Sequence, residues 1–259
     1  MTHSMSTPTS HGPAESPHKH RMAARFRLGS RFGAIHFSTV HLLVSLVVLL
    51  VMAPFFEHFQ NGDAIESILL TVVLVLSVLA VGGSRRTILG MFALAGPALF
   101  FKWLNQIRPD LVSPAWFLFG ALAFCTVVIW RLLRFVLHSL RVDNEVLCAS
   151  ISAYLLLGLI WAFGYMLVGL GNPTAFVFTN PHSSQEAMNA RNAFYFSFVT
   201  LSTVGYGDIV PFSGGARVLA MTEALSGMMY VAILIARLVA LQTTTLTQGG
   251  PHHPDNEKS

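Results

Sequence analysis

Charged side chains are scarce in this chain. Asp, Glu, Lys and Arg make up 11% of its 259 residues, whereas an average soluble domain contains about 25%. Hydrophobic residues make up 53%, so the composition excludes an ordinary soluble protein and indicates a membrane protein. A membrane-spanning helix needs about 20 mostly apolar residues. Five stretches meet that length and a sixth, which contains Pro97, is weaker: 37–56, 64–82, 114–137, 146–170 and 216–241, with 87–104 as the weaker one.

Cysteine is also rare, and the sequence contains no pattern typical of an enzyme site. Cys125 and Cys148 fall inside or at the inner end of predicted spans, which favours apolar packing over a disulfide. Six of the eleven histidines lie in the polar tails without a fixed ligand geometry, so we expect no zinc site there. No phosphate-binding glycine loop follows a strand, and no nucleophile has a plausible base. We therefore expect no enzyme activity, no cofactor and no nucleic-acid partner.

Basic residues indicate the orientation in the membrane. Most Lys and Arg lie on one side if six spans alternate, and this side is the cytoplasmic one by the positive-inside rule. We therefore predict a protein of the plasma membrane with both termini on the cytoplasmic side. Residues 1–36 are predicted to form a disordered basic tail rather than a signal peptide. The tail 242–259 is too short and polar to form a ligand-binding domain.

The segment between the last two spans, Gly171–Gly215, contains a stretch that cannot cross a membrane. Its first half is polar and is predicted to be an extracellular loop. The following "AFYFSFVTLS", Ala193–Ser202, is apolar and aromatic, but ten helical residues cover only about half of a 30 Å hydrocarbon core. This pattern predicts a short helix that enters the membrane without crossing it.

The next residues, "TVGYGD" at 203–208, predict an ion path. Non-helical backbone at membrane depth is tolerated only when it is buried in protein or lines a water-filled path. Gly205 and Gly207 can adopt positive φ, so alternation with Val204 and Tyr206 lets successive carbonyl groups point the same way. Rings of such oxygens can replace the hydration shell of a cation. Asp208 would add negative charge at the outer mouth, and the short helix would point its carbonyl end toward the membrane centre.

At these residues the chain resembles potassium channels. "TLSTVGYGD", Thr200–Asp208, is similar to their selectivity filter, and 145–241 resembles their pore module. The resemblance implies an all-α membrane protein with four N-terminal transmembrane helices (37–141) and a two-helix pore domain with a re-entrant pore helix. Its filter residues, which would bind K⁺ through the first five, are Thr203, Val204, Gly205, Tyr206, Gly207 and Asp208. Its pore-helix residues are Tyr195, Phe196, Val199, Thr200 and Ser202.

Three of these pore-helix residues depart from the family pattern. Ser202 stands where Thr is usual, and Tyr195 and Phe196 stand where many relatives have a tryptophan pair. One filter strand cannot form a ring, so a single loop per chain implies a homotetramer. The expected partners are further copies of the chain, K⁺ and membrane lipids.

Two residues of the last span have alternative roles. Glu223 either supports the filter or tunes the cavity, or it lies near the outer end of the helix and reaches interfacial water. Gly227 is a candidate gating hinge, but glycine in a membrane helix also permits close packing.

The fourth span lacks the arginine ladder of a voltage sensor. Arg131 and Arg134 have the required spacing of three residues. The residues that continue this spacing in both directions, such as Val128 and Leu137, are uncharged. These basic residues are instead typical of one face of an interfacial helix, where they anchor to headgroups; the face consists of Arg131, Arg134, His138 and Arg141.

The sequence thus predicts a potassium-selective channel. The alternatives are a potassium transporter subunit or a regulatory membrane protein with a degenerate pore loop, and a weakly selective cation channel. The stimulus that opens the pore has no signature in the sequence.

Overall fold

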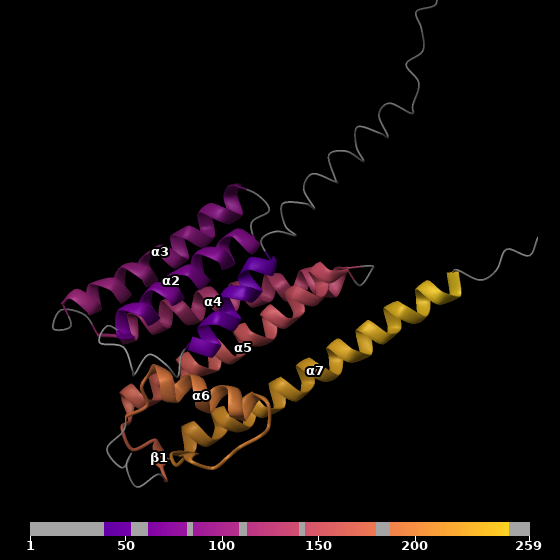
Figure 1. Cartoon of the computed structure of the whole chain (residues 1–259). Helices are drawn as coiled ribbons and strands as arrows, with labels where there is room; N and C mark the ends of the chain where they lie inside the picture. Colours follow the sequence, from indigo (N-terminus) through magenta and orange to yellow (C-terminus); the bar gives the residue numbers. More distant parts are fainter. Residues whose placement is uncertain are drawn as a thin grey trace, which may run out of the picture.

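The computed structural model describes residues 39–52, 62–81, 85–108, 113–139, 143–179 and 187–248. A helix at Thr39–Met52 comes first. Figure 1 shows this helix and those up to α5 lying side by side, with α6 and a small ribbon at one end and α7 running out beneath them. The remaining elements are α2 (Gly62–Val81), α3 (Arg85–Ile107), α4 (Ala115–His138), α5 (Asn144–Gly171), β1 (Phe176–Phe178), α6 (Ala190–Leu201), β2 (Ile209–Pro211) and α7 (Gly214–Gln248).

Four helices among the described residues are long and apolar enough to cross a membrane, which makes the chain a multi-pass membrane protein. They are Ile88–Ile107, Ala115–His138, Asn144–Gly171 and Gly214–Ala240. The weaker predicted span is one of them, since α3 continues through Pro97. The full set of six predicted spans is not confirmed. The apolar helices Thr39–Met52 and Ser67–Ala80 are shorter, and residues 53–56 lie outside the described part of the chain.

The surface of α4 agrees with the predicted division into two faces. Arg131, Arg134 and His138 are exposed, whereas Leu132 and Val136 are buried. Position 141 lies outside the described residues. Both cysteines are free, and Cys125 is buried between the packed helices, as predicted.

An arginine ties α7 to the end of α4. The Arg237 guanidinium donates hydrogen bonds to the backbone carbonyls of Leu137 and Ser139, the latter at 2.8 Å. The last carbonyl groups of a helix have no partner within it, and a cation there is favourable. This contact therefore joins the helical bundle to the last helix across about 100 residues of sequence.

The structure differs from the predicted elements at three places. The short helix begins at Ala190, not Ala193, because the Asn189 side chain caps it by accepting a hydrogen bond from the backbone N–H of Asn192. The loop prediction missed a two-stranded antiparallel ribbon, in which β1 pairs with β2. The last helix continues to Gln248, seven residues beyond the predicted span 216–241; extending an existing helix avoids the cost of nucleation.

Candidate functional site

The short helix α6 lies against both α5 and α7. On the α5 side, a Cβ added to Gly158 would lie 2.8 Å from the Phe198 ring, so only glycine permits this approach. The Ser197 hydroxyl lies 2.7 Å from the carbonyl oxygen of Gly158. On the α7 side, a Cβ at Gly227 would clash with the carbonyl oxygen of Leu201. Gly158 therefore lets α5 approach the Phe198 ring of α6, and Gly227 lets α7 approach the backbone of α6 at Leu201.

After α6, every second residue of the segment has a positive φ: Thr203, Gly205 and Gly207. Gly205 and Gly207 have φ of 56° and 79°, which confirms the predicted left-handed conformation. Thr203 also has a positive φ, 60°, which was not predicted, since such a value is uncommon for a residue with a Cβ. Val204 and Gly205 both donate backbone hydrogen bonds to the carbonyl of Val199, at 2.9 and 3.4 Å. The start of the segment is thereby anchored to the last turn of α6.

Four consecutive backbone carbonyl oxygens of this segment accept no hydrogen bond from any described residue; they belong to Thr203, Val204, Gly205 and Tyr206. The next carbonyl groups do have a donor, because the Thr179 hydroxyl lies 3.2 Å from the oxygen of Gly207 and 2.9 Å from that of Asp208. The described residues contain no cluster of His, Cys, Asp or Glu that could hold a metal ion. The backbone therefore supplies four free oxygen ligands in a row.

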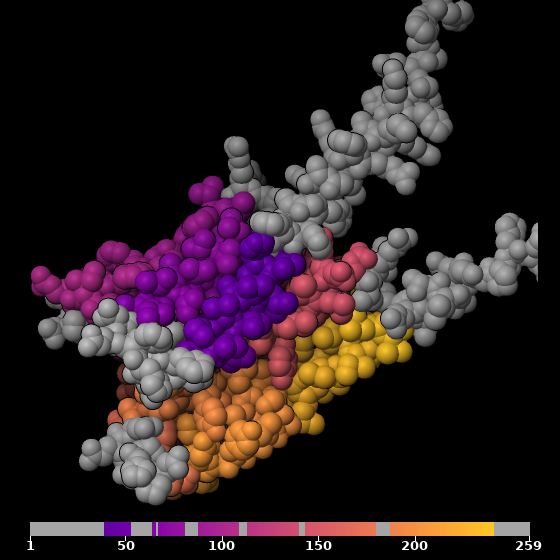
Figure 2. Space-filling model, viewed as in Figure 1, coloured from indigo at the N-terminus to yellow at the C-terminus, as the bar shows by residue number. Residues whose placement is uncertain are grey.

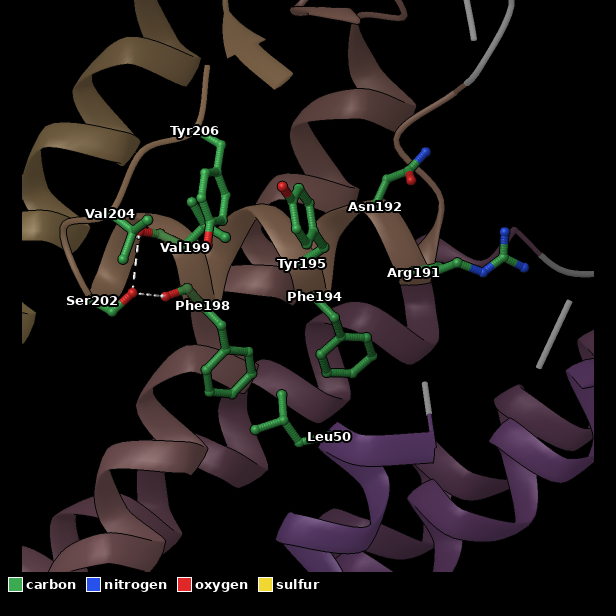
Figure 3. Close-up of a pocket in the computed structure, with 10 residues that line it drawn as sticks. All are labelled: Leu50, Arg191, Asn192, Phe194, Tyr195, Phe198, Val199, Ser202, Val204 and Tyr206. Carbon is green, nitrogen blue, oxygen red and sulfur yellow. Dashed lines mark hydrogen bonds between the residues drawn. The ribbon is translucent and has the colours of Figure 1, made fainter. Parts of the chain in front are cut away.

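Aromatic residues line one side of the segment (Figure 3). The rings of Tyr195 and Tyr206 are nearly parallel, with centroids 6.5 Å apart, and the Tyr195 hydroxyl donates a 2.7 Å hydrogen bond to Asp208. Partial burial, that hydrogen bond and the nearby carboxylate raise the pKa of Tyr195 to about 12, so the hydroxyl is a donor at neutral pH. Tyr206 and Val204 remain 71% and 53% exposed within one chain.

These side chains border an open groove of about 440 Å³. The helix Thr39–Met52 contributes Leu50 to its lining, and Figure 3 shows Tyr195, Tyr206 and Val204 along one part of it. In the space-filling view, α6 and the first part of α7 form one continuous face beside that helix (Figure 2). An accessible apolar groove thus lies next to the four free carbonyl groups.

The other predicted pore-helix residues have different surroundings. Phe196 is buried and faces away from the segment, toward Tyr165, with ring centroids 4.8 Å apart. Thr200 accepts the backbone N–H of Thr203 at 2.9 Å. The Ser202 hydroxyl donates to the carbonyl of Phe198 at 2.7 Å. Phe196 therefore belongs to the packing of α6 rather than to an aromatic surface around the segment.

Glu223 is fully buried, which contradicts the alternative that it reaches interfacial water. Its carboxyl group accepts a hydrogen bond from the Tyr165 hydroxyl of α5 and lies 2.5 Å from the Ser197 hydroxyl of α6. This contact with α6 agrees with the alternative that Glu223 supports the segment from behind. Neither Tyr165 nor Ser197 was predicted. Ser197 had a signal, because it is the one residue without an aromatic ring in the run "FYFSF".

Gly227 has a packing role that its sequence position alone left open. It is buried against the carbonyl of Leu201, and α7 is a continuous helix through it. The hinge role of Gly227 stays a prediction.

Comparison with known proteins places this region in a family. The sequence model of a family described as "Ion channel" matches residues 153–243, a range that contains α6, the segment 203–208 and most of α7. Protein LctB of Bacillus caldotenax is 30% identical over 112 residues, which cover 43% of this chain and 81% of that protein.

Further relatives are larger proteins. Two-pore potassium channel 4 of Arabidopsis thaliana is 33% identical over 98 residues, or 38% of this chain and 34% of that protein. Voltage-gated potassium channel Kch of Escherichia coli (strain K12) is 60% identical over 35 residues, or 14% of this chain and 8% of that protein. The matches to the two-pore channels span about a third of those proteins or less.

The contact at Gly227 generates a stability prediction. In Gly227→Ala the new methyl group would meet the Leu201 carbonyl, and overpacking typically costs about 1–3 kcal/mol. Gly215→Ala on the same helix is the control, since nothing lies within 4 Å of its added Cβ. We expect Gly227→Ala to lower the thermal unfolding temperature in detergent and Gly215→Ala to leave it unchanged or raise it. Equal stability of the two variants would contradict the close contact.

Proposed function

Because this chain belongs to the ion channel family, we propose that it conducts K⁺ selectively through a path lined by the backbone carbonyl groups of residues 203–207. The observation that carries the proposal is the run of four carbonyl oxygens from Thr203 to Tyr206 without a hydrogen-bond donor among the described residues. Hydrocarbon supplies no donor for such groups, so they need a different partner. The names of several relatives, potassium channels of plants and of a bacterium, support K⁺ as that partner. Membership of an ion channel family also means that the chain is not an enzyme.

The proposed mechanism is replacement of the hydration shell of K⁺. Carbonyl oxygens at successive levels take the place of water oxygens, and the ion moves from one level to the next. The C-terminal end of α6 carries about half a negative charge. This charge would favour a cation beside Thr203, on the side of the membrane centre. Asp208, held by Tyr195, would add negative charge at the other end of the path.

A path needs several chains. One chain supplies one wall of carbonyl groups, so we propose a homotetramer with the segment at its fourfold axis. Support comes from surfaces that a single chain leaves uncovered. Tyr206 is 71% exposed beside the groove, and α7 presents a long apolar surface to its surroundings: Val218, Met221, Leu225, Met228 and Met229 are each more than half exposed.

We also propose the full membrane arrangement expected from the sequence. Four helices before position 141 would precede a pore domain in which α5 and α7 span the membrane and α6 enters it from outside. Both termini would then be cytoplasmic, in a plasma membrane, with lipid around the helices. The basic residues at the end of α4 and the short length of α6 support this orientation.

Gly205 provides a test of the ion path. Alanine at φ 56° costs about 1–2 kcal/mol, once for each chain around a ring, so Gly205→Ala should abolish K⁺-selective current. The control is Gly171→Ala, which has open space for a Cβ and no positive φ. The measurement is the reversal potential in planar bilayers with unequal K⁺ and Na⁺. Undiminished selective current from Gly205→Ala would remove the assignment of 203–207, and slow saturable uptake by the unaltered chain would indicate a carrier instead.

Assembly provides a second test. The purified protein should behave as four copies of a 28.3 kDa chain, because only closure around an axis surrounds an ion with carbonyl oxygens. Native mass spectrometry in mild detergent measures this number. A stable monomer or dimer that still conducts would refute the tetramer.

The response to voltage provides a third test. Moving one charge across 100 mV is worth about 2.3 kcal/mol, but Arg131 and Arg134 are exposed near the C-terminal end of α4 and would have little of the field to cross. We expect open probability to change by less than about tenfold over 100 mV, equivalent to about 1.4 kcal/mol. Recordings in symmetric K⁺ measure it. A steep response that flattens in Arg131→Gln and Arg134→Gln would show that these residues sense voltage.

A further inference from the structure

Glu223 is a buried acid without a cationic partner. Its side chain is fully buried in α7, where an isolated carboxylate is costly. Among the described residues, its hydrogen-bond partners are the hydroxyls of Tyr165 and Ser197, and no Lys or Arg pairs with it. Among the described residues, the titratable groups that interact electrostatically with it are two phenols of α5, Tyr165 and Tyr154. From α6 it meets only the neutral hydroxyl of Ser197.

The contacts around Glu223 require three protons. One carboxyl oxygen accepts the Tyr165 hydroxyl, the other lies 2.5 Å from Ser197 Oγ, and Ser197 Oγ lies 2.7 Å from the carbonyl oxygen of Gly158. Tyrosine and serine supply one proton each. If Glu223 were ionised, Ser197 could satisfy only one of its two close contacts, and two acceptor oxygens would face each other without a proton. A carboxylic acid supplies the third proton and satisfies every contact.

We propose that Glu223 is a neutral carboxylic acid that positions α6. It donates to Ser197, which in turn donates to the carbonyl of Gly158, while Tyr165 donates to the second carboxyl oxygen. The acid thus joins α7 to α6 and α5 through one chain of hydrogen bonds. Its effect on ion selectivity rests on the function proposed above, whereas its protonation does not.

The geometry shows how this acid would act on the ion path. Glu223 and Gly227 are four residues apart on α7, and they contact Ser197 and Leu201, which are four residues apart on α6. One face of α7 therefore holds one face of α6 along a full turn. The Val199 carbonyl between these contacts anchors Val204 and Gly205. A shift of α6 would accordingly move the free carbonyl groups.

The first experiment measures protonation directly. The infrared difference spectrum between the full-length wild type and Glu223→Gln, at neutral pH in a detergent without ester groups, isolates this one side chain. We expect the carbonyl stretch of a protonated acid, shifted in D₂O, to be lost in the variant. Loss of carboxylate bands instead would overturn the proposal, and this result does not depend on whether the protein conducts.

The second experiment tests positioning by reversal potentials in bilayers. Glu223→Gln keeps one donor and one acceptor, so we expect the K⁺/Na⁺ permeability ratio to stay within about twofold of wild type. Glu223→Leu has a similar volume but leaves the Tyr165 hydroxyl without a partner, and we expect the ratio to fall about fivefold or more. Wild-type selectivity in Glu223→Leu, or a fall in Glu223→Gln as large as in Glu223→Leu, would overturn the positioning role.

A serine pair controls for general loss of stability. Ser197→Ala breaks the link to α6 and should lower the permeability ratio even if Glu223→Leu fails to assemble. Ser77→Ala is the matched control, because Ser77 is equally buried and its hydroxyl donates, at 2.7 Å, only to a carbonyl of its own helix. We expect Ser77→Ala to keep wild-type selectivity. Equal ratios in the two serine variants would overturn the link between Glu223 and the path, whereas a non-selective wild type would count against the proposed function alone.

Discussion

Backbone carbonyl groups need hydrogen-bond or ion partners, and the most informative feature of this chain is a run of four that have no donor among the described residues. A helix satisfies its own backbone, so leaving the helical conformation inside a membrane is costly unless the segment meets protein, water or an ion. Among the described residues, hydrogen bonds hold the N–H groups of Thr203, Val204 and Gly205 and the residues after Tyr206, but not the carbonyl oxygens of the segment. The Val199 carbonyl anchors its start, and Thr179 and Tyr195 bind the residues that follow it. The oxygens between these anchors stay available.

Holding the segment depends on holding α6, and close approach is how the long helices do it. Gly158 and Gly227 leave no room for a side chain where α5 and α7 meet α6. Small residues in membrane helices permit such contacts, which bring polar groups within hydrogen-bonding distance. Glu223 can reach Ser197 only because α7 is this close. The packing and the polar network are thus two consequences of the same glycine positions.

The contact of Arg237 with the end of α4 connects this arrangement to the preceding helices. Arg237 lies on α7 fourteen residues after Glu223, and its partners are the last carbonyl groups of α4. A displacement of α4 would therefore be felt by the same helix that supports α6. This gives the N-terminal helices a physical route to the proposed ion path that does not require charges moving across the membrane.

Local sequence determined much of the site, and tertiary structure decided the rest. The short apolar ten-residue run and the glycines at 205 and 207 depend on chain geometry within a few residues, so a short helix and the positive φ values of the two glycines could be predicted. The start of α6 was missed, although its Asn189 cap is also a local feature. Glu223 shows the limit most clearly. Its sequence position allowed water or protein as its surroundings, and only the folding of α5 and α6 around it brought Tyr165 and Ser197 to its carboxyl group, since those partners are 58 and 26 residues away in the chain.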